Sequence, residues 1–295
     1  MLARWWRKNR AAALFLGPWL VGTLVFGVLP MLVSLYLSFT DYNMFKPPSW
    51  IGADNFASML TSDSRWSQAL KVTIRYVFIG MPAQLVTAFA LALALNRGIR
   101  GLPLFRAVFY IPSLLGPSVA ISILWKEVFG QEGIFNVVTG WFGMEPRSWI
   151  ADPSTSLYTL IALLVWQFGS PMIIFLAGLK QVPKELYESA SIDGAGAVTR
   201  FFRITFPMVT PIVFFNVVMQ LIGAFQAFTP AFIIGGGDGG SLDSTLFYTL
   251  YLYIKGFNEF SMGYASAMAW FLLLVIAAAT YLLFLSSRKW VHYEN

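Results

Sequence analysis

Long stretches without a charged residue alternate with short polar segments along this chain. Six of these stretches are long enough to cross a bilayer, which takes roughly 20 apolar residues. The pattern therefore predicts an all-α polytopic membrane protein that forms a single domain over residues 1–295. The six predicted transmembrane helices cover residues 11–39, 76–96, 107–125, 156–179, 207–234 and 262–285.

Two further uncharged runs, residues 133–144 and 244–254, hold only 12 and 11 residues and both contain aromatic side chains. Segments of that length are too short to span, so each is expected to form an interfacial or re-entrant helix at the outer membrane surface. The outer loop over residues 41–71 contains Pro47, Pro48 and Gly52, and a short helix is expected in it near residues 56–60.

Composition supports a lipid environment and narrows the chemistry. Only 12% of the residues are charged, whereas soluble domains carry about 25%. There is no cysteine, and the single histidine, His292, lies in the tail after the last span, so we expect no metal and no cofactor. None of the spans contains a carboxylate or histidine, which argues against an ion-coupled carrier and against a membrane enzyme.

The basic residues predict the orientation. With the N-terminus inside, thirteen Lys and Arg residues fall in inner segments and six in outer loops, which places both termini in the cytoplasm. The net charge of +6 then reflects attraction to anionic membrane lipid, not nucleic-acid binding. The first apolar run is longer than the roughly 7–15 residues of a signal peptide core, so it is interpreted as a retained transmembrane helix.

Proline and glycine recur inside spans three, four and five, where kinks can open space for a solute. Amide, hydroxyl and aromatic groups in these spans suit a neutral, hydroxyl-rich solute. The same polar groups could instead hydrogen-bond neighbouring helices, and both interpretations stay open. The residues predicted to line a translocation path are Ser118, Gln167, Ser170, Phe225 and Gln226.

A polar segment over residues 181–206 separates spans four and five. Pro183 can begin a helix that runs to about Ile192, and Gly194 can supply the left-handed turn before a second helix starts near residues 195–197. The turn is flanked by small side chains, which allow another protein to approach closely. A plain cytoplasmic hairpin is the alternative interpretation of this segment.

This segment resembles the EAA loop of permease subunits of bacterial ATP-binding-cassette importers. The matching positions are Glu188, Ser189, Ala190, Gly194, Ile204, Phe206 and Pro207, with Ser for the first Ala and Phe for Leu as departures. The resemblance implies the type I importer permease fold and docking of the loop on an ATPase. The residues to which it assigns this coupling are Tyr187, Glu188, Ser189, Ala190, Asp193, Gly194 and Ala195.

Four other stretches resemble the carbohydrate-type permeases of this group, which carry maltose, other oligosaccharides or glycerol phosphate. They are residues 109–112, 178–183, 225–228 and 263–267. The resemblance implies a sugar or polyol importer in the bacterial inner membrane, not an enzyme. Its implied partners are a second homologous permease, two cytoplasmic ATPases and an extracytoplasmic solute-binding protein.

The chain has no phosphate-binding loop of its own, so the ATPases must be separate polypeptides. The glycine-rich run over residues 235–240 is interpreted either as an exposed flexible loop or as a contact for the solute-binding protein. The rival hypothesis for the whole chain is a stand-alone channel or facilitator for a small neutral solute.

Overall fold

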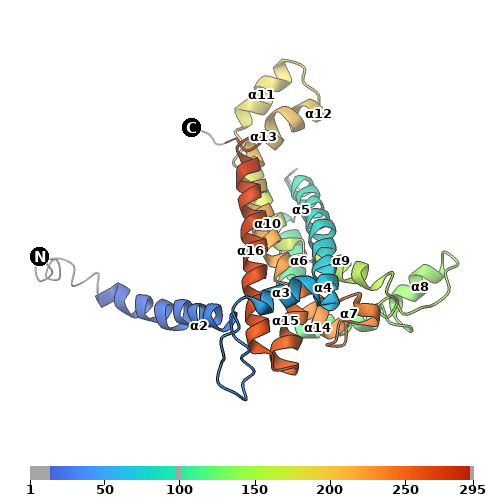
Figure 1. Cartoon of the computed structure of the whole chain (residues 1–295). Coiled ribbons are helices and arrows are strands. Elements are labelled where there is room, and N and C mark those ends of the chain that lie inside the picture. The colour runs from blue at the N-terminus through green and yellow to red at the C-terminus, as the bar shows by residue number, and fades with distance from the viewer. Residues whose placement is uncertain (1–13, 97–100, 293–295) are drawn as a thin grey trace, which may run out of the picture. The chain divides into compact units, whose positions relative to one another are not determined.

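The computed structural model describes residues 14–96 and 101–292 (Figure 1). Within these ranges the regular elements are helices, apart from an isolated bridge between Thr40 and Trp50. The chain divides into two compact units, Met1–Asp63 with Leu252–Leu272 and Ser64–Tyr251 with Leu273–Asn295.

The first unit holds the apolar helix Leu14–Leu37, which includes α2 (Leu29–Leu37). A loop then leads to α3 (Asp54–Thr61), the short helix predicted near residues 56–60. Asn55 of α3 organises this loop, since its amide donates hydrogen bonds to the backbone oxygens of Ser38 and Thr40 at 2.9 and 2.8 Å. The unit also includes a π-helical turn, Ile254–Asn258, and the start of α16 (Met262–Ser287).

The second unit holds the helices that surround the candidate site. Span two is one helix, Ser64–Leu95, made of α4 (Ser64–Arg75), a π-helical turn (Tyr76–Gly80) and α5 (Met81–Leu95). The elements that follow are α6 (Leu102–Leu115), α7 (Val119–Val128), α8 (Ile134–Gly140), α9 (Ser156–Trp166), α10 (Gly169–Leu179), α11 (Lys184–Ile192), α12 (Ala197–Arg200), α13 (Phe206–Phe225), α14 (Thr229–Ile234) and α15 (Tyr248–Tyr253).

Four described helices are long and apolar enough to cross a membrane, and the number rises to six if each of two bent pairs is one span. Kinks predicted in spans three and four are present, with bends of 96° between α6 and α7 and 41° between α9 and α10. At the larger bend Pro117 has no N–H to continue a helix, and Ser118 caps α7 by accepting a hydrogen bond from the Ile121 N–H.

Span two begins earlier than its sequence predicts. Residues 64–71, assigned to the outer loop because of Arg65 and Lys71, are helical and continuous with the span. The assignment was wrong because α4 is amphipathic. It buries Trp66, Ala69, Val72 and Thr73, leaves Lys71 exposed, and pairs Arg65 with Asp243 within the unit.

Close packing of α5 against α10 forms the centre of this unit. Ala88 and Ala92 of α5 are fully buried, as are Met172 and Phe175 of α10. Small residues at such an interface let transmembrane helices approach and gain van der Waals contact.

The glycine-rich run over residues 235–240 is a packed turn, which corrects the expectation of an exposed flexible loop. Gly235 and Gly239 are buried, and Thr245 donates its N–H and hydroxyl to the Gly239 oxygen, both at 2.9 Å. Arg65 from the start of span two pairs with both carboxylate oxygens of Asp243 at 2.7 and 2.9 Å. The Arg65 guanidinium also donates to the Asp238 backbone oxygen at 2.9 Å.

We expect Asp243→Asn to lower the free energy of unfolding by about 1–2 kcal/mol, because it weakens a bidentate, charge-assisted pair. Asn keeps the side-chain shape and tolerates the left-handed backbone of Asp243, whose φ is +54°. The measurement is thermal unfolding in detergent, with protease cleavage of residues 235–246 as a local probe. Glu259→Gln is the control, since its pair with Lys255 spans one helical turn and should cost less than about 0.5 kcal/mol. Equal losses in both variants would contradict the assigned role.

Candidate transport pocket and projecting hairpin

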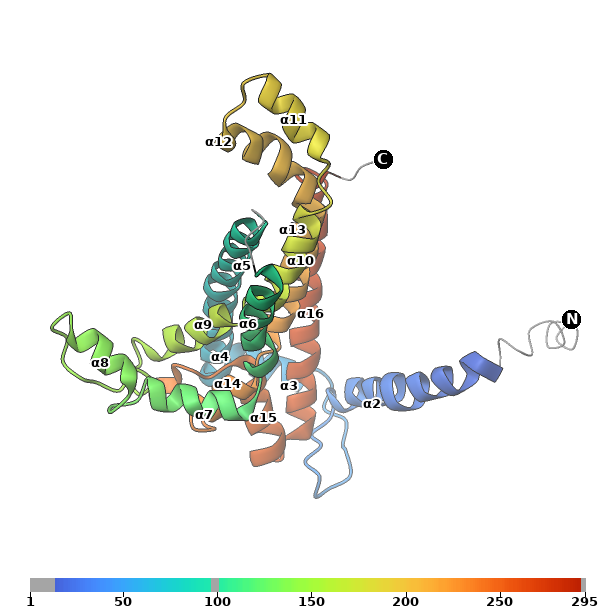
Figure 2. The same cartoon turned by 180° about the vertical axis from the view of Figure 1, so that it is seen from behind.

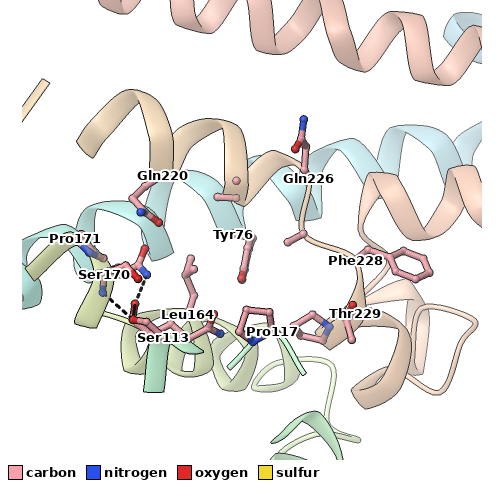
Figure 3. Close-up of a pocket in the computed structure, with 16 residues that line it drawn as sticks. Tyr76, Ser113, Pro117, Leu164, Ser170, Pro171, Gln220, Gln226, Phe228 and Thr229 are labelled. Atoms are coloured by element: carbon pink, nitrogen blue, oxygen red, sulfur yellow. Dashed lines mark hydrogen bonds between the residues drawn. The ribbon is translucent and has the colours of Figure 1, made fainter. Parts of the chain in front are cut away.

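A cavity of about 370 Å³ lies between span two, both bent spans and the α13–α14 segment (Figure 3). Gln220, Ser170 and Ser113 gather at one end of it and Phe228 and Thr229 at the other, with Tyr76 between them. Its lining contains amides and hydroxyls but no side chain that is charged at neutral pH. The polar residues of the lining are Tyr76, Gln84, Ser113, Gln167, Ser170, Gln220, Gln226 and Thr229.

The break in span four is held by side chains from two other spans. Pro171 has no N–H, so the Gln167 carbonyl loses the partner it would have in a continuous helix. This carbonyl instead accepts hydrogen bonds from the Ser113 hydroxyl and the Gln84 amide, both at 2.9 Å. The Ser113 oxygen accepts in turn from the Ser170 N–H at 2.9 Å. Spans two, three and four are thereby joined at the wall of the cavity.

Two glycines make this junction sterically possible. A Cβ on Gly169 would lie 2.3 Å from the Phe109 backbone oxygen, and a Cβ on Gly116 would lie 2.2 Å from Cγ of Gln167. Contacts that short do not occur between non-bonded atoms, so any larger residue would force spans three and four apart.

Tyr76 provides a hydroxyl that the sequence analysis did not identify. The residue is only 3% exposed, lies in the π-helical turn of span two and packs its ring 4.5 Å from that of Phe247. Its hydroxyl group borders the cavity and has no hydrogen-bond partner among the described residues. A π-helical turn is often found at functional sites. Tyr76 is the first residue of the predicted span two and is not among the five predicted path residues.

Three of the five predicted path residues line the cavity, and two lie outside its lining. Gln167, Ser170 and Gln226 line the cavity. Ser118 does not, because its hydroxyl caps α7, and Phe225 is 2% exposed and lies outside the lining. Gln84, Ser113, Gln220 and Thr229 are, with Tyr76, the other amide and hydroxyl residues of the lining, and none of them is among the five predicted path residues.

The segment over residues 181–206 forms the predicted helix–turn–helix. Helix α11 has the expected bounds, Lys184–Ile192, and α12 begins at Ala197. Gly194 adopts φ +72° between them. Tyr187 and Thr205 fix the hairpin to the start of span five through a hydrogen bond of 2.9 Å between their hydroxyls.

The surface of this hairpin is open in the isolated chain. Glu188, Ser189, Asp193 and Gly194 are exposed, whereas Tyr187, Ala190 and Ala195 are half-buried. Apolar side chains are also exposed around the turn, with Ile192 at 87% and Val198 at 71%. Figure 2 shows α11 and α12 beyond the ends of α10 and α13, so the hairpin projects from the helices that it connects.

Comparison with known proteins defines the class. Residues 84–292 match the family described as "Binding-protein-dependent transport system inner membrane component", and the chain belongs to this family. It is therefore a multi-pass inner-membrane transport component and not an enzyme.

Particular relatives agree with this class. The chain is 50% identical to the probable ABC transporter permease protein YesP of Bacillus subtilis, over 98% of this chain and 94% of that protein. It is 32% identical to the lactose transport system permease protein LacF of Rhizobium radiobacter, over 94% and 93% of the two chains. A solved bacterial alginate ABC transporter in complex with an alginate pentasaccharide-bound periplasmic protein contains a chain of the same fold, with a TM-score of 0.82, 20% identity and coverage of 97% and 96%.

We expect Ser113→Ala to destabilise the protein by about 1–3 kcal/mol, because it leaves the partly buried Ser170 N–H without an acceptor. Ser67→Ala is the control, since the exposed Ser67 hydroxyl bonds only to the Ser64 oxygen one turn away. Thermal unfolding in detergent measures both. A loss no larger than that of the control would show that the junction of the three spans does not depend on Ser113.

Proposed function

We propose that this chain is a pore-forming permease subunit of an ATP-driven importer that moves a sugar or related polyol across the cytoplasmic membrane. The observation that carries the proposal is the cavity between the spans, which is lined by amides and hydroxyls without a charged side chain. The six-span topology, with both termini and the hairpin in the cytoplasm, is part of the proposal and rests on the positive-inside distribution.

The lining suits a solute that carries many hydroxyl groups. Each sugar hydroxyl both donates and accepts, and the side chains of Gln220, Ser170 and Tyr76 can complement either role. At the other end of the cavity the lining includes Phe228, whose ring stacks on that of Phe232 at 5.3 Å and points away from the middle of the cavity (Figure 3). The sugar named for the LacF relative is consistent with this chemistry.

Transport requires the cavity to open alternately to the two sides of the membrane. The exposed hairpin is a surface on which an ATPase subunit can act. We propose that Tyr187, Glu188, Ser189, Ala190, Asp193, Gly194 and Ala195 dock on an ATPase subunit. Glu188 and Asp193 are exposed acidic groups that can pair with basic residues, and the exposed Ile192 and Val198 can enter an apolar cleft.

The remaining partners follow from the class of protein. One permease chain encloses only part of a path, so the proposed pore pairs this chain with a second homologous permease. Two cytoplasmic ATPases act on the two hairpins. A solute-binding protein delivers the sugar from outside, in agreement with the family description and with the periplasmic protein in the alginate transporter complex.

We expect Glu188→Arg combined with Gly194→Val to abolish uptake while the chain remains in the membrane. The first change reverses the charge offered to the ATPase, and the second places a β-branched residue at φ +72°. Cellular uptake, membrane abundance and recovery of the ATPase on mild-detergent purification are measured together. Glu185→Arg, on the same helix but outside the docking set, should retain both uptake and ATPase recovery. Unimpaired uptake by the double variant would favour a stand-alone facilitator.

We expect Tyr76→Phe to raise the KM of sugar uptake about tenfold, the effect of losing roughly 1.4 kcal/mol of hydrogen bonding. The assay uses proteoliposomes of the purified complex and a panel of radiolabelled mono-, di- and oligosaccharides. Tyr158→Phe is the control, because Tyr158 is 58% exposed and lies outside the cavity lining. Transport of none of these sugars by the unaltered complex would refute the substrate class, whereas an unchanged KM would refute only the role of Tyr76.

A further inference from the structure

The segment after the bend in span three forms a rigid arm, defined here as residues 129–150, around Asn136 of α8. The Asn136 Nδ2 group donates to the backbone oxygens of Gly130, Gln131 and Arg147 at 3.0, 2.9 and 2.8 Å. Its Oδ1 accepts from the Arg147 N–H at 3.3 Å and from the Trp149 indole N–H at 2.8 Å. One buried amide thus fastens both flanks of α8.

Aromatic packing completes the inner face of this arm. The Phe135 ring lies 4.7 Å from that of Phe129 and 5.1 Å from that of Trp149. The Thr139 hydroxyl donates to the Phe135 oxygen at 3.1 Å and is buried. The orientation of α8 is therefore set by its own surroundings within the chain.

The opposite face of α8 is apolar and uncovered. Ile134, Val137, Val138 and Trp141 recur at the spacing of one helical face and are 66%, 57%, 40% and 78% exposed. Phe142 continues this surface at 78% exposure. We call these five side chains the α8 stripe.

Charge and position indicate which medium covers the α8 stripe. No charged residue lies between Glu132 and Glu145, so the stripe is bounded by charges and not interrupted by them. The preceding α7 also exposes apolar side chains, Val119, Ile123 and Leu124, and belongs to a bent helix pair that is long and apolar enough to cross a membrane. Figure 2 shows α8 extending sideways from α7, which lies in the half of the unit away from the hairpin of α11 and α12.

We propose that the arm rests on the membrane surface opposite the hairpin and inserts the α8 stripe into the acyl chains of that leaflet. Helices of this kind lie in the interface plane with their apolar face among the lipid chains, and Trp is enriched at that depth. The arm would then tie the outer end of span three to the lipid, independently of which solute passes through the cavity.

The absence of cysteine from the chain allows a direct test. Single-cysteine variants Val137→Cys, in the α8 stripe, and Glu132→Cys, beside it, are labelled with an environment-sensitive NBD fluorophore. The labelled chain is reconstituted with its co-purifying subunits into phosphatidylethanolamine–phosphatidylglycerol vesicles, with and without lipids brominated on the acyl chains. Val138→Cys provides a second stripe position if the first variant does not fold.

We expect the label at position 137 to emit at shorter wavelength and to be quenched several-fold more by brominated lipid than the label at position 132. Aqueous iodide should quench the two labels in the reverse order. Strong iodide quenching at position 137 would show that the stripe faces water. Protection from both quenchers would show that protein covers it, and either result would overturn the proposal.

Discussion

Inside a bilayer no water replaces a lost backbone hydrogen bond, and Pro171 removes one from the middle of span four. The structure meets this constraint with side chains from two other helices, since Ser113 and Gln84 both donate to the Gln167 carbonyl. The hydrogen bonds to the free carbonyl at this one helix break therefore fix the relative positions of three spans. The space left beside the break is the cavity, so the same interaction that stabilises the bundle also forms the wall of the proposed path.

Some polar groups of the cavity wall are hydrogen-bonded within the chain, and others have no hydrogen-bond partner among the described residues. Ser113 and the Nε2 group of Gln84 are occupied by the backbone at the break, and they leave Gln84 Oε1 without a partner. The Tyr76 hydroxyl also borders the cavity without a hydrogen-bond partner among the described residues. A buried polar group without a partner is costly, and a hydroxylated solute relieves that cost when it arrives. In the proposed function, a solute of this kind would meet groups that are already in place.

Two segments outside the cavity are ordered by local contacts and present faces for other molecules. The hairpin of α11 and α12 is tied down by Tyr187 and Thr205 and exposes acidic and apolar groups around Gly194. The arm at α8 is tied down by Asn136 and exposes an apolar stripe. In both cases the inner contacts set the orientation, so the outer face is ready for its partner without further folding.

The sequence by itself determined the elements whose causes are local. Apolar length predicts the long helices, and Pro183 with Gly194 predicts the two helices and the turn of the hairpin, because helix starts and left-handed turns depend on a few adjacent positions. Only the tertiary structure decided which residues line the cavity. Tyr76 and Gln84 line the cavity and Ser118 and Phe225 do not, because the face of each helix that borders the cavity depends on how the helices pack together. The tertiary structure also decided that the glycine-rich turn is packed, because its partner Arg65 lies 178 positions from Asp243 along the chain. Contacts over such separations come from the fold as a whole and leave no periodic signal in the sequence.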